Sequence, residues 1–186
     1  MRIIAGEAKG RNINAPRGMD TRPTLDRVRE NLFNMLQLAV PGAVVLDLFS
    51  GSGALSLEAL SRGAVHATMV DHSREANRTE TENARMLGFD DRAEIILADW
   101  KQALRRLQSE GRRYSLVFLD PPYSMHDLTD VFDGVRKIIC EGGVIAVEHM
   151  ASAPPVVPDT FRLEKARAWG YCAFSLYYPV GEGDNI

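Results

Sequence analysis

Residues 43–55, Ala-Val-Val-Leu-Asp-Leu-Phe-Ser-Gly-Ser-Gly-Ala-Leu, decide the fold of this 186-residue chain. The apolar run Ala43–Leu48 predicts a buried strand, and the glycines after it lead into a helix expected over Ala54–Arg62. Glycines at a strand-to-helix turn let the backbone approach a ligand closely, and the helix N-terminus then points its N–H groups at that ligand. The segment therefore predicts an α/β unit with a ligand site at the carboxyl end of its strand.

The same alternation of strand and helix continues along the chain. Further buried strands are predicted at Ala67–Val70, Ala93–Ala98, Leu116–Leu119 and Val144–Val147, and further helices at Arg74–Leu87, Lys101–Gln108 and Leu128–Ile139. Short apolar runs separated by helices are typical of a parallel sheet covered on both faces. The last part differs, because Phe161–Trp169 and Tyr171–Tyr178 flank Gly170 and predict an antiparallel hairpin. This pattern predicts the seven-stranded, mostly parallel, Rossmann-like sheet of class I methyltransferases, and alone it leaves other doubly wound α/β folds open.

The N-terminal part has its own pattern and an excess of positive charge. Arg2–Ala5 and Gly10–Asn14 predict a short β-hairpin, and a helix is expected from about Thr24 to Pro41-Gly42. Residues 1–29 hold seven cationic and three acidic side chains, whereas the whole chain has a formal charge of −3. A cationic arm on an acidic body fits a polyanionic partner, because each Lys or Arg that neutralises a phosphate releases a counterion. A solvated surface on which arginines happen to cluster is the alternative.

Composition excludes several classes of protein. Apolar residues make up 45% and charged residues 25%, which is ordinary for a globular domain and excludes global disorder. No uncharged run is long and apolar enough to predict a membrane helix. Cys140 and Cys172 lack the spacing of metal ligands and are too few for a disulfide framework, and the four histidines are scattered. We therefore expect a cytoplasmic, single-domain protein with no metal site.

Acidic residues lie at the carboxyl ends of the first three predicted core strands or directly after them. Asp71 ends the second strand, where it can accept hydrogen bonds from a ribose diol, and Asp99 beside Trp100 offers an acceptor next to an aromatic plane for an adenine. Asp47 would repel a pyrophosphate, but it would attract a ligand with an ammonium and a sulfonium group. Ser56 also fits the third glycine of a dinucleotide fingerprint poorly. These residues favour an S-adenosylmethionine site, and for Asp71 or Asp99 alone the alternative is an acid that caps the next helix.

The turn Asp120-Pro121-Pro122-Tyr123 is the most specific motif in the chain. Two consecutive prolines fix the backbone and remove two N–H donors, so the polar groups left in the turn are acceptors. The Asp120 carboxylate and the Pro121 carbonyl can then both accept from one exocyclic NH₂, while Tyr123 offers a face on which a base stacks. The motif predicts methyl transfer to an amino group, aligned by Asp120 without a metal. A rigid turn with a packed tyrosine is the alternative.

With these motifs, the sequence resembles the RsmD family of bacterial 16S rRNA guanine-N2 methyltransferases. The resemblance covers most of the chain. It is carried by Arg2-Ile3-Ile4-Ala5-Gly6, Lys9-Gly10-Arg11, Arg22-Pro23-Thr24, Asp26-Arg27-Val28-Arg29-Glu30, the segment Asp47–Leu55, Leu57-Glu58-Ala59-Leu60-Ser61-Arg62-Gly63-Ala64 and Asp120–Tyr123. The N-terminal motifs separate this family from other enzymes with an Asp-Pro-Pro-Tyr turn.

The resemblance implies a role for each group of candidate residues. Asp47, Gly51, Gly53, Asp71 and Asp99 would line the S-adenosylmethionine pocket, and their neighbours Phe49, Ser52, His72 and Trp100 complete the candidate set. Asp120, Pro121, Pro122 and Tyr123 would hold the guanine amine. Arg2, Lys9, Arg11, Arg22, Arg27 and Arg29 would contact rRNA. Residues 1–40 would be a substrate-contacting extension of a single domain, and residues 41–186 its cofactor-binding and catalytic core.

The expected partner is 16S rRNA, free or within a 30S subunit or assembly intermediate, and the expected protein is a monomer. Two other functions stay open from the residues alone. One is an amino-methyltransferase with the same turn and another target, such as adenine N6 or a protein amide. The other is a non-catalytic factor that holds rRNA during assembly. An NAD-type oxidoreductase is less consistent with the sequence, which shows no acid–base dyad beside the glycine loop.

Overall fold

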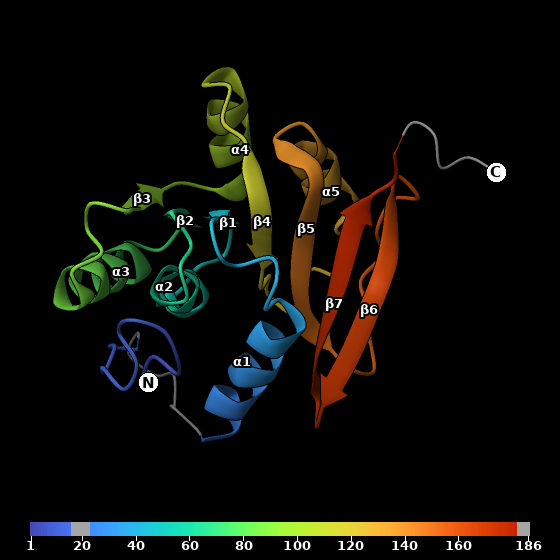
Figure 1. Cartoon of the computed structure of the whole chain (residues 1–186). Coiled ribbons are helices and arrows are strands. Elements are labelled where there is room, and N and C mark those ends of the chain that lie inside the picture. Colours follow the sequence, from blue (N-terminus) through green and yellow to red (C-terminus); the bar gives the residue numbers. More distant parts are fainter. Residues whose placement is uncertain (16–22, 182–186) are drawn as a thin grey trace.

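A computed structural model describes residues 1–15 and 23–181 of the chain. Helices and strands alternate from the first core strand onward (Figure 1). The helices are α1 (Pro23–Met35), α2 (Ala54–Ser61), α3 (Arg74–Leu87), α4 (Trp100–Ser109) and α5 (Thr129–Arg136). The strands are β1 (Val44–Asp47), β2 (His66–Asp71), β3 (Ala93–Leu97), β4 (Tyr114–Leu119), β5 (Ile139–Met150), β6 (Phe161–Trp169) and β7 (Cys172–Pro179). None of the helices in these two ranges is both long and apolar enough to span a bilayer.

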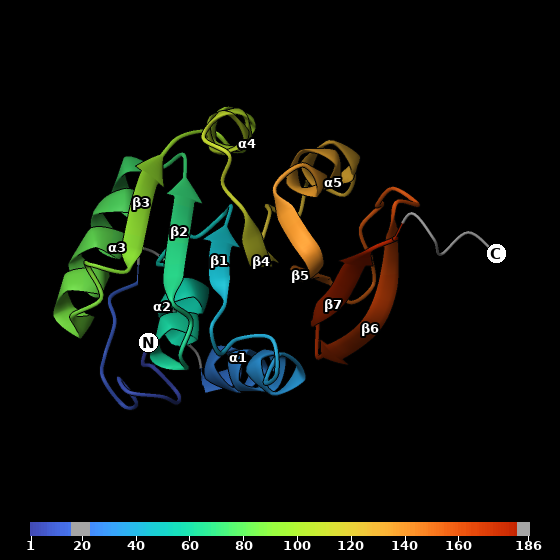
Figure 2. The same cartoon turned by 45° about the horizontal axis from the view of Figure 1, so that its top comes forward.

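The strands form one sheet in the order β3-β2-β1-β4-β5-β7-β6. β1 to β5 pair in parallel, and β7 pairs antiparallel with both β5 and β6. Figure 2 shows α1, α2 and α3 on one side of the sheet and α4 and α5 on the other. Each side buries its own apolar cluster, around Leu32, Phe33 and Phe118 on the first and around Val117, Phe132 and Tyr177 on the second. The predicted fold class is confirmed, including the antiparallel hairpin at the end.

The boundary between α5 and β5 was predicted wrongly. The helix ends at Arg136 and the strand begins at Ile139, so the predicted helix overshoots and the predicted strand starts too late. Glu141, Gly142 and Gly143 interrupt the apolar run that marks a strand in the sequence. The pairing of Ile139 with Tyr114, followed by a register shift, nevertheless keeps this part of the chain in the sheet.

The predicted N-terminal hairpin forms only a short antiparallel ladder. Its isolated bridge joins Arg2 and Asn12, and the Ile3 N–H donates to the Arg11 carbonyl at 2.9 Å. Gly6, with a φ of +84°, lies so close to α2 that an added Cβ would stand 1.7 Å from the Ser61 carbonyl oxygen. The ladder therefore lies against α2, as Figure 1 shows, and its backbone is shaped by that contact instead of by extended strand pairing.

Glu58 of α2 anchors the N-terminal segment to this helix. Its side chain is fully buried on α2 and accepts the backbone N–H groups of Ile4 at 2.7 Å and Ala5 at 3.0 Å. The same carboxylate pairs with Arg62 at 2.7 Å and lies 3.9 Å from the Arg29 Nε. One carboxylate therefore joins the N-terminal segment, α1 and α2.

Candidate active site

A cavity of about 480 Å³ lies at the carboxyl edge of the sheet. Its walls come from the glycine loop after β1, from Asp71 at the end of β2, from the turn 120–123 after β4, from Glu148 of β5 and from Phe174 of β7. This volume is within the range of roughly 300–1,000 Å³ that is typical of small-molecule sites. The structure therefore places the two motifs singled out in the sequence, the glycine loop and the Asp-Pro-Pro-Tyr turn, on one cavity.

Asp47 contributes a buried carboxylate to the wall of this cavity. Its Oδ2 accepts from the Ser56 hydroxyl at 3.0 Å, and its Oδ1 has no hydrogen-bond partner in the described part of the chain. Burial raises the pKa of Asp47 to about 7, although the hydrogen bond from Ser56 stabilises the charged carboxylate and so acts to lower this pKa. A buried carboxylate oxygen without a hydrogen-bond partner costs free energy, and a cationic group bound in the cavity would supply that partner.

Asp71 holds the glycine loop in place. Its Oδ2 accepts the Gly51 N–H at 3.0 Å, and its Oδ1 accepts the Ser73 N–H at 2.8 Å. Each carboxylate oxygen has a second lone pair, so hydroxyl groups of a ligand in the cavity can still donate to it. The neighbouring His72 lines the same cavity with a largely exposed ring.

Asp99 and Trp100 lie at a small side cavity of about 30 Å³. This cavity shares Phe49, Asp71 and His72 with the main one, so the two are adjacent. Asp99 also caps α4, because its Oδ1 accepts the backbone N–H of Lys101 at 2.8 Å. One oxygen of Asp99 thus caps the helix, as the alternative interpretation expects. Asp99 also lies beside Trp100 at the side cavity, and its contact with an adenine stays a prediction.

A buried pair that the sequence analysis missed supports the glycine loop from the side of α3. The Ser50 hydroxyl donates to Glu80 at 2.5 Å, and Glu80 is fully buried. Burial raises the pKa of Glu80 to about 8, with smaller contributions from the charges of Asp47 and Asp71. Gly53, with a φ of +75°, begins α2 so close to Met69 that an added Cβ would lie 2.7 Å from its sulfur. The loop is therefore fixed on both sides.

Asp120 follows β4 and opens into the main cavity. Asp120 is exposed to the cavity. Desolvation of its carboxyl group by the surrounding protein, followed by the negative charges of Glu148 and Asp47, raises the pKa of Asp120 well above its ordinary value. The turn is closed by the Met125 N–H, which donates to the Pro122 carbonyl at 2.8 Å, while no described residue donates to the Pro121 carbonyl.

Both the sequence and the fold are similar to those of known proteins. Residues 1–178 match the family model described as Conserved hypothetical protein 95. The chain belongs to this family, the RsmD family. The Bacillus subtilis protein YlbH is 35% identical over 185 residues, which span 97% of this chain and 100% of the relative. Ribosomal RNA small subunit methyltransferase D of Escherichia coli K12 is 31% identical over 188 residues, 100% of this chain and 93% of the relative. The solved structure of Escherichia coli yhhF has a TM-score of 0.83 at 31% identity and covers 98% of this chain and 99% of that one.

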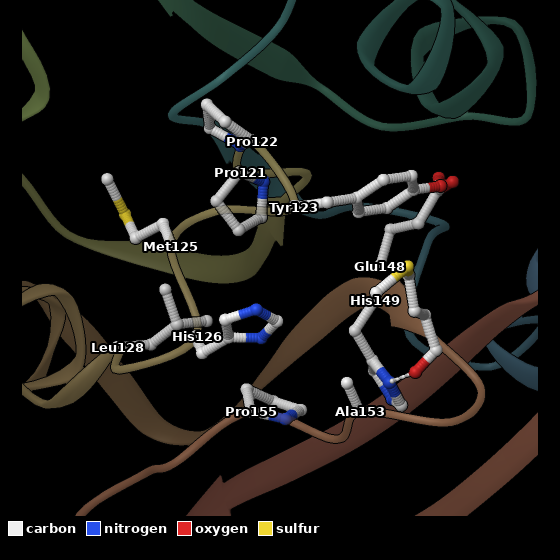
Figure 3. A pocket seen from close by; sticks show the side chains of 11 residues that line it. Pro121, Pro122, Tyr123, Met125, His126, Leu128, Glu148, His149, Ala153 and Pro155 are labelled. Atoms are coloured by element: carbon white, nitrogen blue, oxygen red, sulfur yellow. Dashed lines mark hydrogen bonds between the residues drawn. The ribbon is translucent and has the colours of Figure 1, made fainter.

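In this RsmD-family chain, Glu148 is a further site residue, which the sequence motifs do not indicate. It lines the cavity, and its charge acts on Asp120 and on the Tyr123 phenol. Burial raises the pKa of Glu148, and the Cys172 thiol donates to it at 3.3 Å. Figure 3 shows the Tyr123 ring extending toward Glu148 above a small cavity of about 20 Å³ behind the turn. Glu148 lies near the carboxyl end of β5, and only the pairing of β4 with β5 brings it beside Asp120.

The cationic residues expected to contact rRNA do not share one surface in this RsmD-family chain. Arg2, Lys9 and Arg27 line a surface groove of about 420 Å³. Arg11 instead donates to the carbonyls of Met86 and Leu87 at the end of α3. Arg22 lies outside the described residues.

The prediction of a phosphate contact at Arg29 needs correction. Its side chain is 5% exposed and lies between Asp26, at 3.1 Å, and Glu58, at the wall of the main cavity. The resemblance implies an rRNA contact for Arg29, but two carboxylates hold its side chain inside the protein. Among the described residues, no group of three or more His, Cys, Asp and Glu is arranged to hold a metal ion.

Proposed function

We propose that this protein is an S-adenosylmethionine-dependent methyltransferase that modifies the exocyclic N2 amine of a guanine in 16S rRNA. The observation that carries the proposal is the shared cavity, in which the Asp-Pro-Pro-Tyr turn faces the glycine loop and the unpaired oxygen of Asp47. Family membership supports the reaction class, because the relative in Escherichia coli is named for methylation of small-subunit rRNA.

The residues present fit S-adenosylmethionine. Asp47 would bind the α-ammonium group through its unpaired Oδ1, and Asp71 would accept from the ribose hydroxyls. Asp99 and Trp100 would meet the adenine in the side cavity beyond Phe49. When bound, the cofactor supplies a methyl group on a positively charged sulfur. The acidic lining of the cavity is complementary to that charge.

The turn after β4 would position the amine. Asp120 and the free Pro121 carbonyl would accept its two N–H bonds, which turns the nitrogen lone pair toward the methyl carbon. Asp120 would stabilise the positive charge that the amine nitrogen gains when it is methylated, and it would accept the proton that this nitrogen then loses. Tyr123, which is 44% exposed at the cavity mouth, would stack on the guanine after it is extruded from folded RNA.

The function is tested by mapping 16S rRNA from cells that lack this protein. One N2-methylguanine should be missing, and purified protein with S-adenosylmethionine should restore it on that rRNA or on 30S particles. Loss of an adenine or protein methylation instead would favour an amino-methyltransferase with another target. Unchanged rRNA, with no measurable cofactor binding by calorimetry, would favour a non-catalytic assembly factor.

Cofactor affinity should fall below neutral pH because of Asp47. A bound ammonium requires the charged carboxylate, and the free protein has a pKa of about 7 at this residue. The Kd for S-adenosylhomocysteine, which keeps the ammonium, should therefore be about tenfold weaker at pH 6 than at pH 7.5. Calorimetry at both pH values measures it. Asp47→Asn should bind S-adenosylhomocysteine weakly at both pH values. Glu80→Gln, which imitates a protonated Glu80, should keep the wild-type change in Kd between pH 6 and pH 7.5. A pH step that survives in Asp47→Asn contradicts the assignment.

The groove at the N-terminal segment should bind phosphate. Replacing Arg2, Lys9 and Arg27 together with Gln should weaken binding of 16S rRNA and lower the slope of log K against log salt by about 2–3 units. Filter binding over a range of salt concentrations measures both. The control is Arg105→Gln/Lys137→Gln, which removes exposed cations from α4 and the end of α5 on the other side of the sheet. An unchanged slope in the triple variant would contradict phosphate binding in the groove and would mean that its cations are solvated surface charges.

A further inference from the structure

β6 is the outermost strand of the sheet, and both of its faces are open to solvent. Every residue from Arg162 to Ala168 is exposed, whereas its neighbour β7 is buried over residues 172–177. Figures 1 and 2 place β6 beyond both α1 and α5, at the edge of the molecule farthest from the N-terminal segment. An exposed edge strand of this kind is a surface on which another molecule can dock.

A β-bulge divides β6 into two registers. Arg162 stands opposite Tyr178 before the bulge, and Lys165 stands opposite Leu176 after it. Directly opposed residues of an antiparallel pair point to the same face, and Tyr178 and Leu176, two apart on one strand, share that face. The extra residue, Glu164, therefore brings Arg162 and Lys165 to one face. In an unbroken strand they would point to opposite faces.

The same face continues into the candidate active site. Arg167 stands opposite Phe174, and Phe174 stands opposite Glu148, so the three residues form a row across β6, β7 and β5. Phe174 and Glu148 line the main cavity. Because neighbouring strands lie about 4.8 Å apart, the Arg167 backbone is only about 10 Å from that of Glu148. The row of cations thus begins beside the cavity and runs away from it along β6.

The two faces of β6 differ in charge. The face toward the cavity carries Arg162, Lys165 and Arg167, whereas the opposite face carries Leu163 and alanines. Arg162 pairs with the single acid of the strand, Glu164, at 2.7 Å. In the described part of the chain, Lys165 and Arg167 have no carboxylate partner. Two cations are therefore free to bind an anionic partner.

Aromatic side chains stand where the cationic row meets the cavity. Tyr171, in the turn between β6 and β7, is 63% exposed and lies in the neighbourhood of Tyr123. Trp169 is half-buried and stands opposite Cys172, on the same face as the cations. An exposed ring such as that of Tyr171 stacks on a nucleobase, at about 1–3 kcal/mol per base. Aromatic planes at the cavity followed by a line of cations match the order of base and backbone in RNA.

We propose that the cationic face of β6, formed by Arg162, Lys165 and Arg167 and here called the β6 platform, binds the phosphate backbone of the rRNA that enters the cavity. This inference rests on the proposed function and adds a second RNA contact, on the side of α1 opposite to the N-terminal groove (Figure 1). Phosphate complements the charge of this face. Cations along an edge also discourage pairing with a strand of another protein.

The first test removes the two unpaired cations. Lys165→Gln/Arg167→Gln should lower the salt slope of 16S rRNA binding by about 1.4–1.8 units and raise Kd by about 10- to 30-fold near 0.15 M salt, at 0.7–0.9 units for each phosphate contact. The KM for rRNA should rise in parallel, while the Kd for S-adenosylmethionine stays at its wild-type value. Arg105→Gln/Lys137→Gln is the matched control with the same change in net charge.

The second test keeps composition and net charge and changes only the face. In Lys165→Ala/Ala166→Lys/Arg167→Ala/Ala168→Arg, the same two cations point away from the cavity, at positions that are already exposed. This variant should lose as much RNA affinity as the double Gln variant. Circular dichroism and cofactor binding report whether the hairpin and the core remain folded.

The outcomes separate the platform from the proposed function. Wild-type affinity in either variant, or in both, would overturn the platform while the wild-type protein still methylates rRNA. A change in oligomeric state by light scattering, with RNA binding intact, would mean that β6 contacts a second copy of the chain instead, and would also overturn it. If the wild-type protein binds no cofactor and methylates no rRNA, the proposed function itself fails.

Discussion

Asp120→Ala should reduce methyl transfer to rRNA by about 10²–10⁴-fold in kcat, which is the range for removing a group that aligns and deprotonates a reacting amine. Asp120 lines the cavity beside Glu148, and in our proposal the substrate amine donates its hydrogen bond to the Asp120 carboxylate. Asp47 and Asp71, which we assign to the cofactor, keep their own contacts in the variant. Single-turnover methylation with saturating rRNA should therefore show the loss, while calorimetry shows an S-adenosylmethionine Kd close to that of the wild type.

Two controls make this result specific. Asp133→Ala removes an exposed carboxylate from α5 and should leave turnover unchanged. Glu148→Gln keeps Asp120 but removes the neighbouring charge that helps to raise its pKa. The acidic limb of the kcat profile should then move to lower pH, because Asp120 loses its proton more readily. Near-wild-type turnover in Asp120→Ala would contradict the role of this residue, and an unmoved limb in Glu148→Gln would contradict the coupling of the two acids.

The parts of the site that could be predicted from the sequence are local. The glycine loop and the Asp-Pro-Pro-Tyr turn each carry their meaning in consecutive residues, and a parallel sheet brings the carboxyl ends of its strands to one edge. Once the strand–helix alternation was recognised, the meeting of Asp47, Asp71 and Asp120 at one cavity followed from topology. The cavity lined by all three agrees with that expectation.

The parts that could not be predicted depend on long-range pairing. Glu148 is an ordinary acid at a strand end until β5 pairs with β4 and brings it beside Asp120. Arg11 and Arg29 have the sequence context of surface arginines, and only their tertiary partners distinguish them from Lys9. In β6, the bulge at Glu164 changes which residues share a face, and no residue type in the strand marks that shift.

Glu58 is the clearest residue whose role depends on contacts distant in the sequence. Glu58→Ala should lower the free energy of unfolding by about 3–5 kcal/mol. In the sequence it looks like a surface partner of Arg62, four residues later on one helix. In the structure it is fully buried, and its removal would leave Arg62 and the N–H groups of Ile4 and Ala5 without their acceptor. The buried Arg29 would lose one of its two neighbouring carboxylates and keep only Asp26. Urea unfolding followed by circular dichroism measures the loss, which is a large part of the roughly 5–15 kcal/mol of a typical domain.

The matched control is Glu82→Ala on α3, which breaks an exposed pair with Arg78 at the same four-residue spacing and should cost less than about 1 kcal/mol. A loss from Glu58→Ala as small as this would contradict the anchoring role. Hydrogen exchange locates the effect, because the amides of Ile4 and Ala5 should lose protection before those of the sheet. Since Met1 of the anchored segment and Arg29 both line the main cavity, Glu58→Ala should also weaken cofactor binding at temperatures where the sheet is still folded. A buried carboxylate on α2 would thus control whether the cavity is complete.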